Sequence, residues 1–207
     1  MKLRQKYYDL FSHFYDYFIK IHSRDKNEGL RKYLFEISNV KDYSKILDLC
    51  CGTGSNLTHL EKILKNNGII AGIDFSMGML KKAKEKIFFS YLICGDVEYL
   101  PFKENFFEVI FYTYAFYELK AEKVLNTLNE IKRVLVPKGK LYIMEHEVPK
   151  NKFIKLLYYL RLASMGLKKA RNILSHELEI LSQVFTKVEK IVTPSGNSKI
   201  IICQKEY

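Results

Sequence analysis

The sequence predicts an α/β protein with a doubly wound, seven-stranded and mostly parallel β-sheet. From residue 45 onward, short apolar runs typical of buried strands alternate with amphipathic helical segments. This alternation is typical of parallel sheets whose strands are connected by helices on both faces. The last two apolar runs, at 188–192 and 199–203, have only residues 193–198 between them, which is too short for a helical crossover. They should therefore form an antiparallel hairpin that completes the sheet.

The remaining elements follow in a regular order along the chain. The strands of the parallel part are expected at 45–50, 69–75, 91–95, 107–114 and 140–145, with helices between them at 56–67, 77–87 and 121–135. Two segments lie outside the alternation: residues 5–37, which are rich in Tyr and Phe, and residues 151–185. Both have helical patterns, so we expect one or two helices before the first strand and further helices before the final hairpin.

Composition limits the cellular setting and the classes of ligand. No apolar run approaches the roughly 18–20 residues that a membrane-spanning helix needs, and charged residues interrupt the N-terminus, so we expect a cytoplasmic protein without a signal peptide. The formal charge of +11 favours an anionic partner, although the lysines are spread along the whole chain. Cys50 and Cys51 are adjacent rather than spaced as CxxC, and no His cluster is nearby, so no metal site is expected.

The most informative stretch is 46–55, where a buried strand leads into a glycine loop that opens a helix. Such a loop lets a ligand approach the backbone and exposes N–H groups at the helix start. After Gly52 and Gly54, Leu57 stands where a dinucleotide fingerprint needs its third glycine, and the GK[ST] of a P-loop is missing. Asp48, just before the loop, would repel a pyrophosphate but suits a cofactor that carries ammonium and sulfonium groups.

Two further acids lie at the ends of the next two expected strands. Asp74 comes 20 residues after Gly54, a position that suits a carboxylate accepting both hydroxyls of a ribose. Asp96 follows the third strand, where it can accept from the amino group of an adenine. Asp is also common in turns for local reasons. Acids at three successive strand ends beside a glycine loop nevertheless indicate a ligand site in the crevice above the sheet.

At this point the sequence resembles the class I S-adenosylmethionine (SAM)-dependent methyltransferases, in particular the ubiquinone/menaquinone C-methyltransferase-like group (methyltransferase type 11). Five ordered blocks within residues 44–146, about half of the chain, carry the resemblance. They are Asp48-x-Cys50-x-Gly52-x-Gly54, Gly72-Ile73-Asp74-Phe75-Ser76-x-x-Met79-Leu80, Gly95-Asp96-Val97-Glu98-x-Leu100-Pro101-Phe102, Phe106-Phe107-Glu108-Val109-Ile110 and Glu130-Ile131-x-Arg133-Val134-Leu135-x-Pro137-x-Gly139. Cys50 replaces the first glycine of the family's loop, and Glu108 replaces its usual Asp.

The resemblance implies a Rossmann-like sheet in the order 3-2-1-4-5-7-6 with strand 7 antiparallel. It also implies SAM as cofactor, with S-adenosylhomocysteine as product. The expected cofactor-binding residues are Asp48, Cys50, Gly52, Thr53, Gly54, Asp74, Phe75, Met79, Asp96, Val97 and Tyr114. Asp48 and the glycine loop would hold the methionine part, Asp74 the ribose, Phe75 and Met79 the faces of the adenine, and Asp96 and Val97 its edge.

We expect one domain spanning residues 1–207, in four parts: an N-terminal helical lid at 1–40, a cofactor-binding core at 44–146, a helical insert at 150–185 and a C-terminal hairpin at 186–207. Methyl transfer mainly needs alignment of nucleophile, carbon and sulfur, so the family has no fixed catalytic residue. His146 is a candidate general base, although capping a strand end is the simpler role, and Tyr114 is a candidate pocket residue. Tyr8, Tyr15 and Tyr117 are candidates for contacting the substrate or closing a lid. Aromatic residues at helical spacing are usually core, but in the resembling group the N-terminal segment commonly closes over SAM.

The acceptor is less constrained than the cofactor. We expect a small or lipid-like acceptor, either a quinone-ring precursor or a phospholipid amine, and a monomer or homodimer. Residues 150–171 mix leucines with basic residues, which suits an anionic membrane surface. Their charges scatter around a helical wheel, however, which favours a helix packed on the sheet.

Two other function classes remain open. An RNA or protein methyltransferase would suit the charge, but 111–114 lack the N/D-P-P-Y/F signature of amino-directed nucleic-acid enzymes. A non-catalytic SAM-binding regulatory protein would also keep the glycines and acids of the loop, so these residues alone do not prove turnover.

Overall fold

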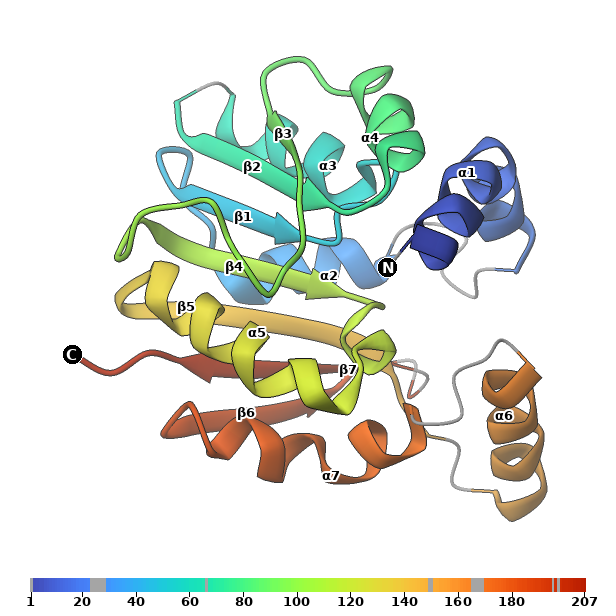
Figure 1. Ribbon diagram of the computed structural model, residues 1–207. Coiled ribbons are helices and arrows are strands. Elements are labelled where there is room, and N and C mark those ends of the chain that lie inside the picture. The colour runs from blue at the N-terminus through green and yellow to red at the C-terminus, as the bar shows by residue number, and fades with distance from the viewer. Residues whose placement is uncertain are drawn as a thin grey trace.

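The alternating segments form one seven-stranded sheet in the order β3-β2-β1-β4-β5-β7-β6 (Figure 1). This computed structural model describes residues 2–22, 29–65, 67–148, 151–164, 170–194, 196 and 198–207. The strands are β1 Lys45–Leu49, β2 Ile69–Asp74, β3 Tyr91–Cys94, β4 Phe107–Thr113, β5 Leu135–His146, β6 Lys187–Val192 and β7 Ser198–Gln204. β7 pairs antiparallel with both β5 and β6, and the other neighbours are parallel. The predicted order and the antiparallel final strand are therefore confirmed.

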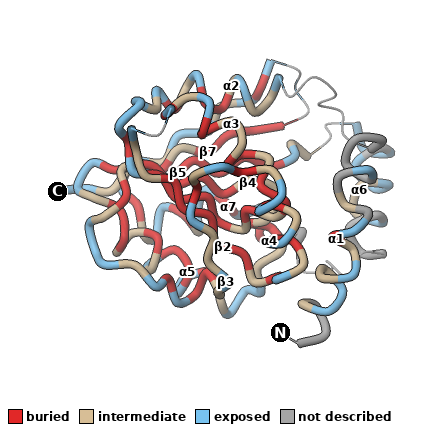
Figure 2. The backbone as a smooth tube through the Cα atoms, turned by 90° about the horizontal axis from the view of Figure 1, so that it is seen from above, coloured by how far each residue is buried: buried red, intermediate tan, exposed pale blue. Residues whose placement is uncertain are grey.

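Helices cover both faces of the sheet, as the doubly wound pattern predicts. Figure 2 shows the buried middle layer with α2 and α3 on one side and α5 on the other. The helices are α1 Lys2–His22, α2 Gly29–Ser38, α3 Ser55–Leu64, α4 Met77–Lys84, α5 Ala121–Val134, α6 Lys152–Ser164 and α7 Ala170–Ser182, with a short 3₁₀ helix, η1, at Phe116–Glu118. Among these described helices, none is both long and apolar enough to cross a membrane.

The side chains of each central strand divide between two cores. In β4, Ile110 and Tyr112 belong to the core beneath α5 and α7, whereas Val109 and Phe111 belong to the core beneath α2 and α3. Successive residues of a strand point to opposite faces, so a strand buried on both sides must be apolar throughout. This requirement explains why the central strands appear in the sequence as continuous apolar runs.

Two expectations differ from the structure. β5 begins at Leu135 rather than at residue 140, because Leu135 already pairs with Phe107 before a register shift leads to the pair Val109–Lys140. The prediction that the helix within 150–171 packs on the sheet is wrong: α6 stands away from it, beyond the end to which β1 and β4 point (Figure 1). Leu156, Leu157 and Leu160 of α6 are exposed rather than buried against strands.

Candidate functional site

The loop after β1 lies at the carboxyl end of the central strands and has an unusual backbone. Cys50, Gly52 and Gly54 all have positive φ, at 52°, 53° and 80°. A Cβ on Gly54 would come within 3.1 Å of the Cβ of Ala83, so glycine is needed there for packing as well as for conformation. A Cβ on Gly52 would meet nothing nearer than the Cys50 carbonyl oxygen at 4.0 Å. The backbone of the loop is therefore open to a ligand at Gly52.

Asp48 is a buried carboxylate with one unused oxygen. Asp48 is only 1% exposed, and its Oδ1 accepts a hydrogen bond of 2.9 Å from Asn56 Nδ2. Its Oδ2 has no hydrogen-bond partner within the described part of the chain. Burial raises the pKa of Asp48 to about 7, because the ionised form loses its hydration. A buried carboxylate of this kind gains most from a cationic ligand.

Asn56, which the sequence analysis did not single out, connects three elements at this point. Its Nδ2 donates to Thr113 Oγ1 at the end of β4 (3.0 Å) as well as to Asp48, and its Oδ1 accepts from Arg31 Nε of α2 (3.1 Å). Asn56 therefore fixes the start of α3 against β1 and β4. Its place directly inside the helix after the glycine loop was the one signal available in the sequence.

Asp74, the last residue of β2, connects the glycine loop to α4. Its Oδ2 accepts from the backbone N–H of Gly52 (2.9 Å), and its Oδ1 accepts from the backbone N–H of Ser76 (2.8 Å). Burial raises the pKa of Asp74 to about 6, although both hydrogen bonds oppose this rise. Each carboxylate oxygen can accept a second hydrogen bond, so these contacts leave Asp74 able to bind hydroxyl groups.

The next residues of the predicted site differ in burial. Thr53, Met79 and Val97 are buried, whereas Phe75 is half-buried. Asp96, two residues after β3, accepts a hydrogen bond of 3.2 Å from the backbone N–H of Glu98 and forms an ion pair of 3.3 Å with Lys123 of α5.

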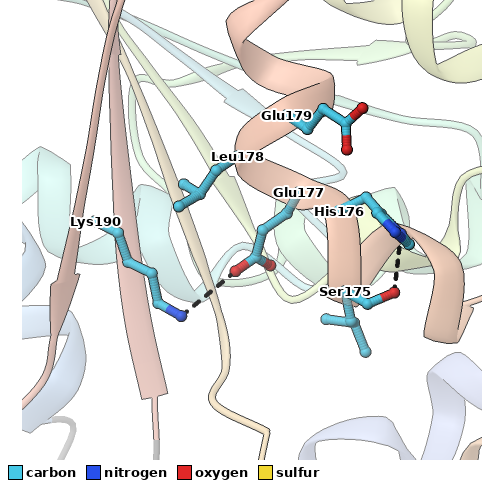
Figure 3. Close-up of a pocket in the computed structure, with 7 residues that line it drawn as sticks. Ser175, His176, Glu177, Leu178, Glu179 and Lys190 are labelled. Carbon is cyan, nitrogen blue, oxygen red and sulfur yellow. Dashed lines mark hydrogen bonds and ion pairs between the residues drawn. The ribbon is translucent and has the colours of Figure 1, made fainter.

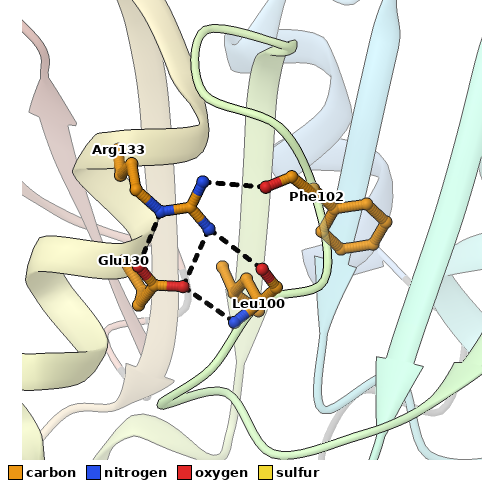
Figure 4. Close-up of polar contacts among 4 residues, drawn as sticks. All are labelled: Leu100, Phe102, Glu130 and Arg133. Carbon is orange, nitrogen blue, oxygen red and sulfur yellow. Dashed lines mark hydrogen bonds and ion pairs between the residues drawn. The ribbon is translucent and has the colours of Figure 1, made fainter.

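The loop that follows Asp96 is held by two residues of α5 (Figure 4). Arg133 donates to the carbonyl oxygens of Phe102 (2.8 Å) and Leu100 (2.9 Å), and Glu130 accepts from the backbone N–H of Leu100 (2.8 Å). Arg133 and Glu130 also pair with each other at 2.6 Å. Glu130 and Arg133, which belong to the fifth sequence block, therefore fix the loop that carries Asp96. The position of the block in the sequence did not reveal this role.

Helix α1 lies against α4 and contacts the start of that helix. Asp9 accepts from Ser76 Oγ (2.6 Å) and from the backbone N–H of Gly78 (2.9 Å), and these hydrogen bonds lower the pKa of Asp9. Gln5 Nε2 donates to the carbonyl oxygen of Phe75 (2.9 Å). The first helix is thereby fixed to the residues that follow β2.

Tyr8 extends this contact to the other side of the site. Its ring meets Phe75 edge to face at 5.5 Å, and its hydroxyl donates to the Glu118 carboxylate at 2.8 Å. Glu118 belongs to η1, just after β4, so α1 reaches across from β2 to β4. Tyr15 packs farther along α1, edge to face with Phe11.

Tyr114 and His146 lie together at the ends of β4 and β5. Their ring centroids are 4.7 Å apart, and the Tyr114 hydroxyl lies 3.5 Å from Ser198 Oγ at the start of β7. Tyr114 has a φ of +55°, and its backbone N–H donates to the carbonyl oxygen of Met144. The structure thus brings together the two residues that the sequence offered as catalytic candidates, with His146 exposed at the end of its strand.

Behind them, Glu145 and Tyr117 are buried. Glu145 Oε1 accepts from the backbone N–H of Phe116 (2.9 Å), and burial raises the pKa of Glu145 well above its usual range. Tyr117 packs with Leu174, and burial raises its pKa too. Both groups therefore favour their neutral forms, and Glu145 holds η1 in place.

A hollow between α7 and β6 is not lined by the glycine loop (Figure 3). Within it Glu177 meets Lys190 at 3.6 Å, and Glu177 also pairs with the buried Lys199 at 2.5 Å. In the parts of the chain that the structure describes, no group of three or more His, Cys, Asp or Glu side chains is placed to hold a metal ion.

Comparison with known proteins gives a consistent result. Residues 46–139 match the family model described as a methyltransferase domain. A demethylmenaquinone methyltransferase from Staphylococcus saprophyticus is 33% identical over 163 residues, which cover 76% of this chain and 69% of that protein. A ubiquinone/menaquinone biosynthesis C-methyltransferase from Wigglesworthia glossinidia brevipalpis is 37% identical over 120 residues, or 55% of this chain and 47% of that protein.

Solved structures agree at the level of the fold. A SAM-dependent methyltransferase from Aquifex aeolicus superposes with a TM-score of 0.65 at 19% identity, covering 84% of this chain and 88% of that one. A putative SAM-dependent methyltransferase from Methanococcus maripaludis gives a TM-score of 0.63 at 17% identity, covering 86% of this chain and 84% of that one.

Proposed function

Because the chain belongs to the SAM-dependent methyltransferases, we propose that it transfers the methyl group of SAM to the ring of a lipid-tailed quinone precursor in the cytoplasm. The observation that carries this proposal is the identity with relatives named for quinone methylation, one of which covers three quarters of this chain. The chain spans about two thirds of the first relative and about half of the second, so the acceptor stays part of the proposal.

The residues around the glycine loop fit SAM. The unused Oδ2 of Asp48 suits the cationic methionine end of the cofactor, and the open backbone at Gly52 leaves room for it. We assign Cys50, Thr53 and Gly54 to the same end and Asp74 to the ribose hydroxyls. Phe75 and Met79 then flank the adenine, while Asp96 and Val97 meet its edge. SAM supplies a methyl group that is bound to a sulfonium sulfur. When the methyl carbon is attacked, the sulfur part leaves as a neutral thioether.

The acceptor would enter between α1 and the residues that follow β4 and β5. Tyr8 and Tyr15, both half-buried on α1, offer aromatic surface for a planar ring there, while Tyr117 is buried against Leu174 beside them in the chain segment after β4. Tyr114 and His146 stand at the neighbouring strand ends. A ring carbon attacks more readily when a ring hydroxyl is deprotonated, so we assign His146 the role of taking that proton. The carbon then forms its bond to the methyl group, and loss of the ring C–H proton to water restores aromaticity.

The proposal is tested by incubating the purified full chain with methyl-labelled SAM and three acceptors in turn: a short-tailed demethylmenaquinone kept in its reduced quinol form (which carries the ring hydroxyl), phosphatidylethanolamine and transfer RNA. We expect the label in the quinone, and we expect Asp48→Asn to lose this activity while Asp42→Asn, at an exposed acid, keeps it. Label in the phospholipid or in the RNA would show that this molecule, rather than the quinone, is the acceptor. Saturable SAM binding without transfer to any of the three would favour a regulatory protein.

His146 is tested separately. His146→Gln keeps a hydrogen-bonding side chain of similar length but has no group that titrates near neutral pH. We expect the rising limb of the pH–rate profile between pH 5 and pH 8 to disappear in this variant, with SAM affinity unchanged. An unaltered profile would show that another group takes the proton.

A further inference from the structure

Helix α6 presents an apolar stripe to solvent. Phe153, Leu156, Leu157 and Leu160 follow the three- and four-residue spacing that places side chains on one face of a helix. All four are between 49% and 68% exposed. Figures 1 and 2 show α6 standing away from the sheet. A contiguous apolar face of this kind is unfavourable in water and marks an interaction surface.

The orientation of this stripe is fixed by the opposite side of the helix. Tyr158 and Tyr159 are half-buried and pack, together with Val148, against Tyr117 and Leu174. The leucines point outward because the tyrosines already occupy the side that faces the protein. The same tyrosines connect α6 to Tyr117, a candidate acceptor contact after β4.

Helix α1 adds a second apolar strip on the same side of the molecule. Tyr7, Leu10 and Tyr17 share one face of α1 and are between 58% and 72% exposed. Tyr8 turns the other way, toward Phe75 and Glu118. Both helices lie beyond the end to which the parallel strands point (Figure 1), which is also the end that carries the glycine loop.

The charge around α6 decides what this surface meets. Lys152 and Lys155 are exposed on the helix itself. The surrounding segment 150–171 contains further lysines and arginines and no Asp or Glu, in a chain of net charge +11. A second copy of the chain would bring the same positive charge to the interface, which opposes association through this face. An anionic lipid surface offers both apolar depth and complementary charge.

We propose that the exposed stripe of α6 (Phe153, Leu156, Leu157, Leu160), bordered by Lys152 and accompanied by Tyr7, Leu10 and Tyr17 of α1, docks the protein on an anionic lipid bilayer. Docking in this orientation turns the carboxyl ends of the strands, and with them Tyr117, toward the membrane. A lipid-tailed acceptor then reaches the site without its tail crossing water. This last step rests on the proposed function; the docking itself does not.

The test is co-sedimentation of the full chain with vesicles of phosphatidylcholine alone and of phosphatidylcholine mixed equally with phosphatidylglycerol. We expect binding to the mixed vesicles and little to the neutral ones. The double variant Leu156→Gln/Leu157→Gln should bind the mixed vesicles on the order of tenfold to a hundredfold more weakly, because two apolar side chains no longer enter the interface. Lys152→Gln should bind about fivefold more weakly, as expected for one charge near the surface, whereas Lys155→Gln, on the side of the helix that carries Tyr158 and Tyr159, should change binding less.

Matched variants separate the docking surface from general effects. Leu125→Gln/Leu178→Gln replaces exposed leucines of α5 and α7, and Lys84→Gln/Lys140→Gln removes two exposed charges elsewhere; both should bind as the unmodified chain does. Equal losses in the α6 variants and these controls would overturn the proposal, as would equal binding to neutral and anionic vesicles. Self-association abolished by Leu156→Gln/Leu157→Gln, without vesicle binding, would make the stripe an interface between copies and overturn it too.

The vesicles contain neither SAM nor an acceptor, so the two proposals fail separately. Binding to anionic vesicles without quinone methylation would overturn the proposed function and leave the docking surface in place. Methylation of a quinone in detergent without vesicle binding would overturn the docking surface and leave the proposed function in place.

Discussion

Asp48→Asn separates the stability of the buried site from its affinity for the cofactor. The amide has nearly the same shape as the carboxylate, and its Oδ1 can still accept from Asn56 Nδ2. The substitution removes a charge that burial disfavours, since burial raises the pKa of Asp48 to about 7. It also places an NH₂ group where Oδ2 found no partner within the described residues.

The size of the expected change in stability follows from the shift in the pKa of Asp48. A rise from 3.8 to about 7 means that folding costs about 4 kcal/mol more once Asp48 is ionised in both states. Because the folded-state pKa is the higher one, this cost is absent below pH 3.8, grows between pH 3.8 and pH 7, and is complete above pH 7. An unpaired NH₂ group costs about 1–3 kcal/mol at every pH. The stability of Asp48→Asn relative to the unmodified chain should therefore rise by about 2–3 kcal/mol from pH 5 to pH 8.

The cofactor should respond in the opposite sense. Losing the carboxylate removes a charge-assisted contact worth about 1.5–3 kcal/mol, so SAM should bind on the order of tenfold to a hundredfold more weakly. Urea unfolding at pH 5 and pH 8 measures the first effect, and calorimetric titration with SAM at pH 8 measures the second. Asp42→Asn, at an exposed acid, should change neither. A stability difference that does not vary with pH would refute the buried ionised carboxylate, and unchanged SAM affinity would refute its role as a ligand.

Three further substitutions test neighbouring parts of the site. Tyr8→Phe keeps the ring against Phe75 but loses the hydrogen bond to Glu118, so stopped-flow measurements should show SAM leaving about tenfold faster; an unchanged rate would mean that α1 does not close over the cofactor. Cys50→Gly relieves a left-handed backbone in a residue with a side chain, and urea titration should show a gain of about 0.5–1 kcal/mol. A loss of stability would show that the contact between Cys50 Sγ and the Tyr112 hydroxyl contributes more than the relief of the left-handed backbone. Arg133→Lys cannot span the carbonyl oxygens of Leu100 and Phe102 together, so the free energy of unfolding should fall by about 2 kcal/mol and SAM affinity with it. Retained affinity would show that the loop carrying Asp96 does not depend on α5.

The central strands could be predicted because burial on both faces leaves a strong pattern. Val109 and Phe111 face one core while Ile110 and Tyr112 face the other, so no polar residue interrupts the middle of β4. The start of β5 could not be predicted in the same way. Pro137 and Gly139 have the composition of a turn, and only the pairing of Leu135 with Phe107 makes the segment a strand. Local sequence does not encode that pairing.

The residues of the candidate site fall into the same two groups: those that a sequence pattern predicts and those that depend on contacts between distant elements. The placement of Asp48 and Asp74 near one another could be predicted because the carboxyl ends of parallel strands meet at one edge of a sheet. The contact of Tyr8 with Glu118 joins residues 110 positions apart, from elements that no periodic pattern relates. The roles of Asn56 and Arg133 likewise depend on partners in other elements. Side chains at strand ends are therefore predictable from one sequence, whereas the contacts that orient them are not.

The distribution of charge reconciles a strongly basic chain with a cationic cofactor. The lysines lie mostly at the surface, where salt screens their fields beyond about 8 Å. Asp48 and Asp74 are buried at the site, where the lower dielectric strengthens their interaction with any charge that displaces water. At the proposed site the cofactor would therefore respond to two nearby carboxylates rather than to the net charge of +11. The surface lysines remain available for a different ligand, and on α6 Lys152 borders an exposed apolar stripe that suits an anionic membrane rather than SAM.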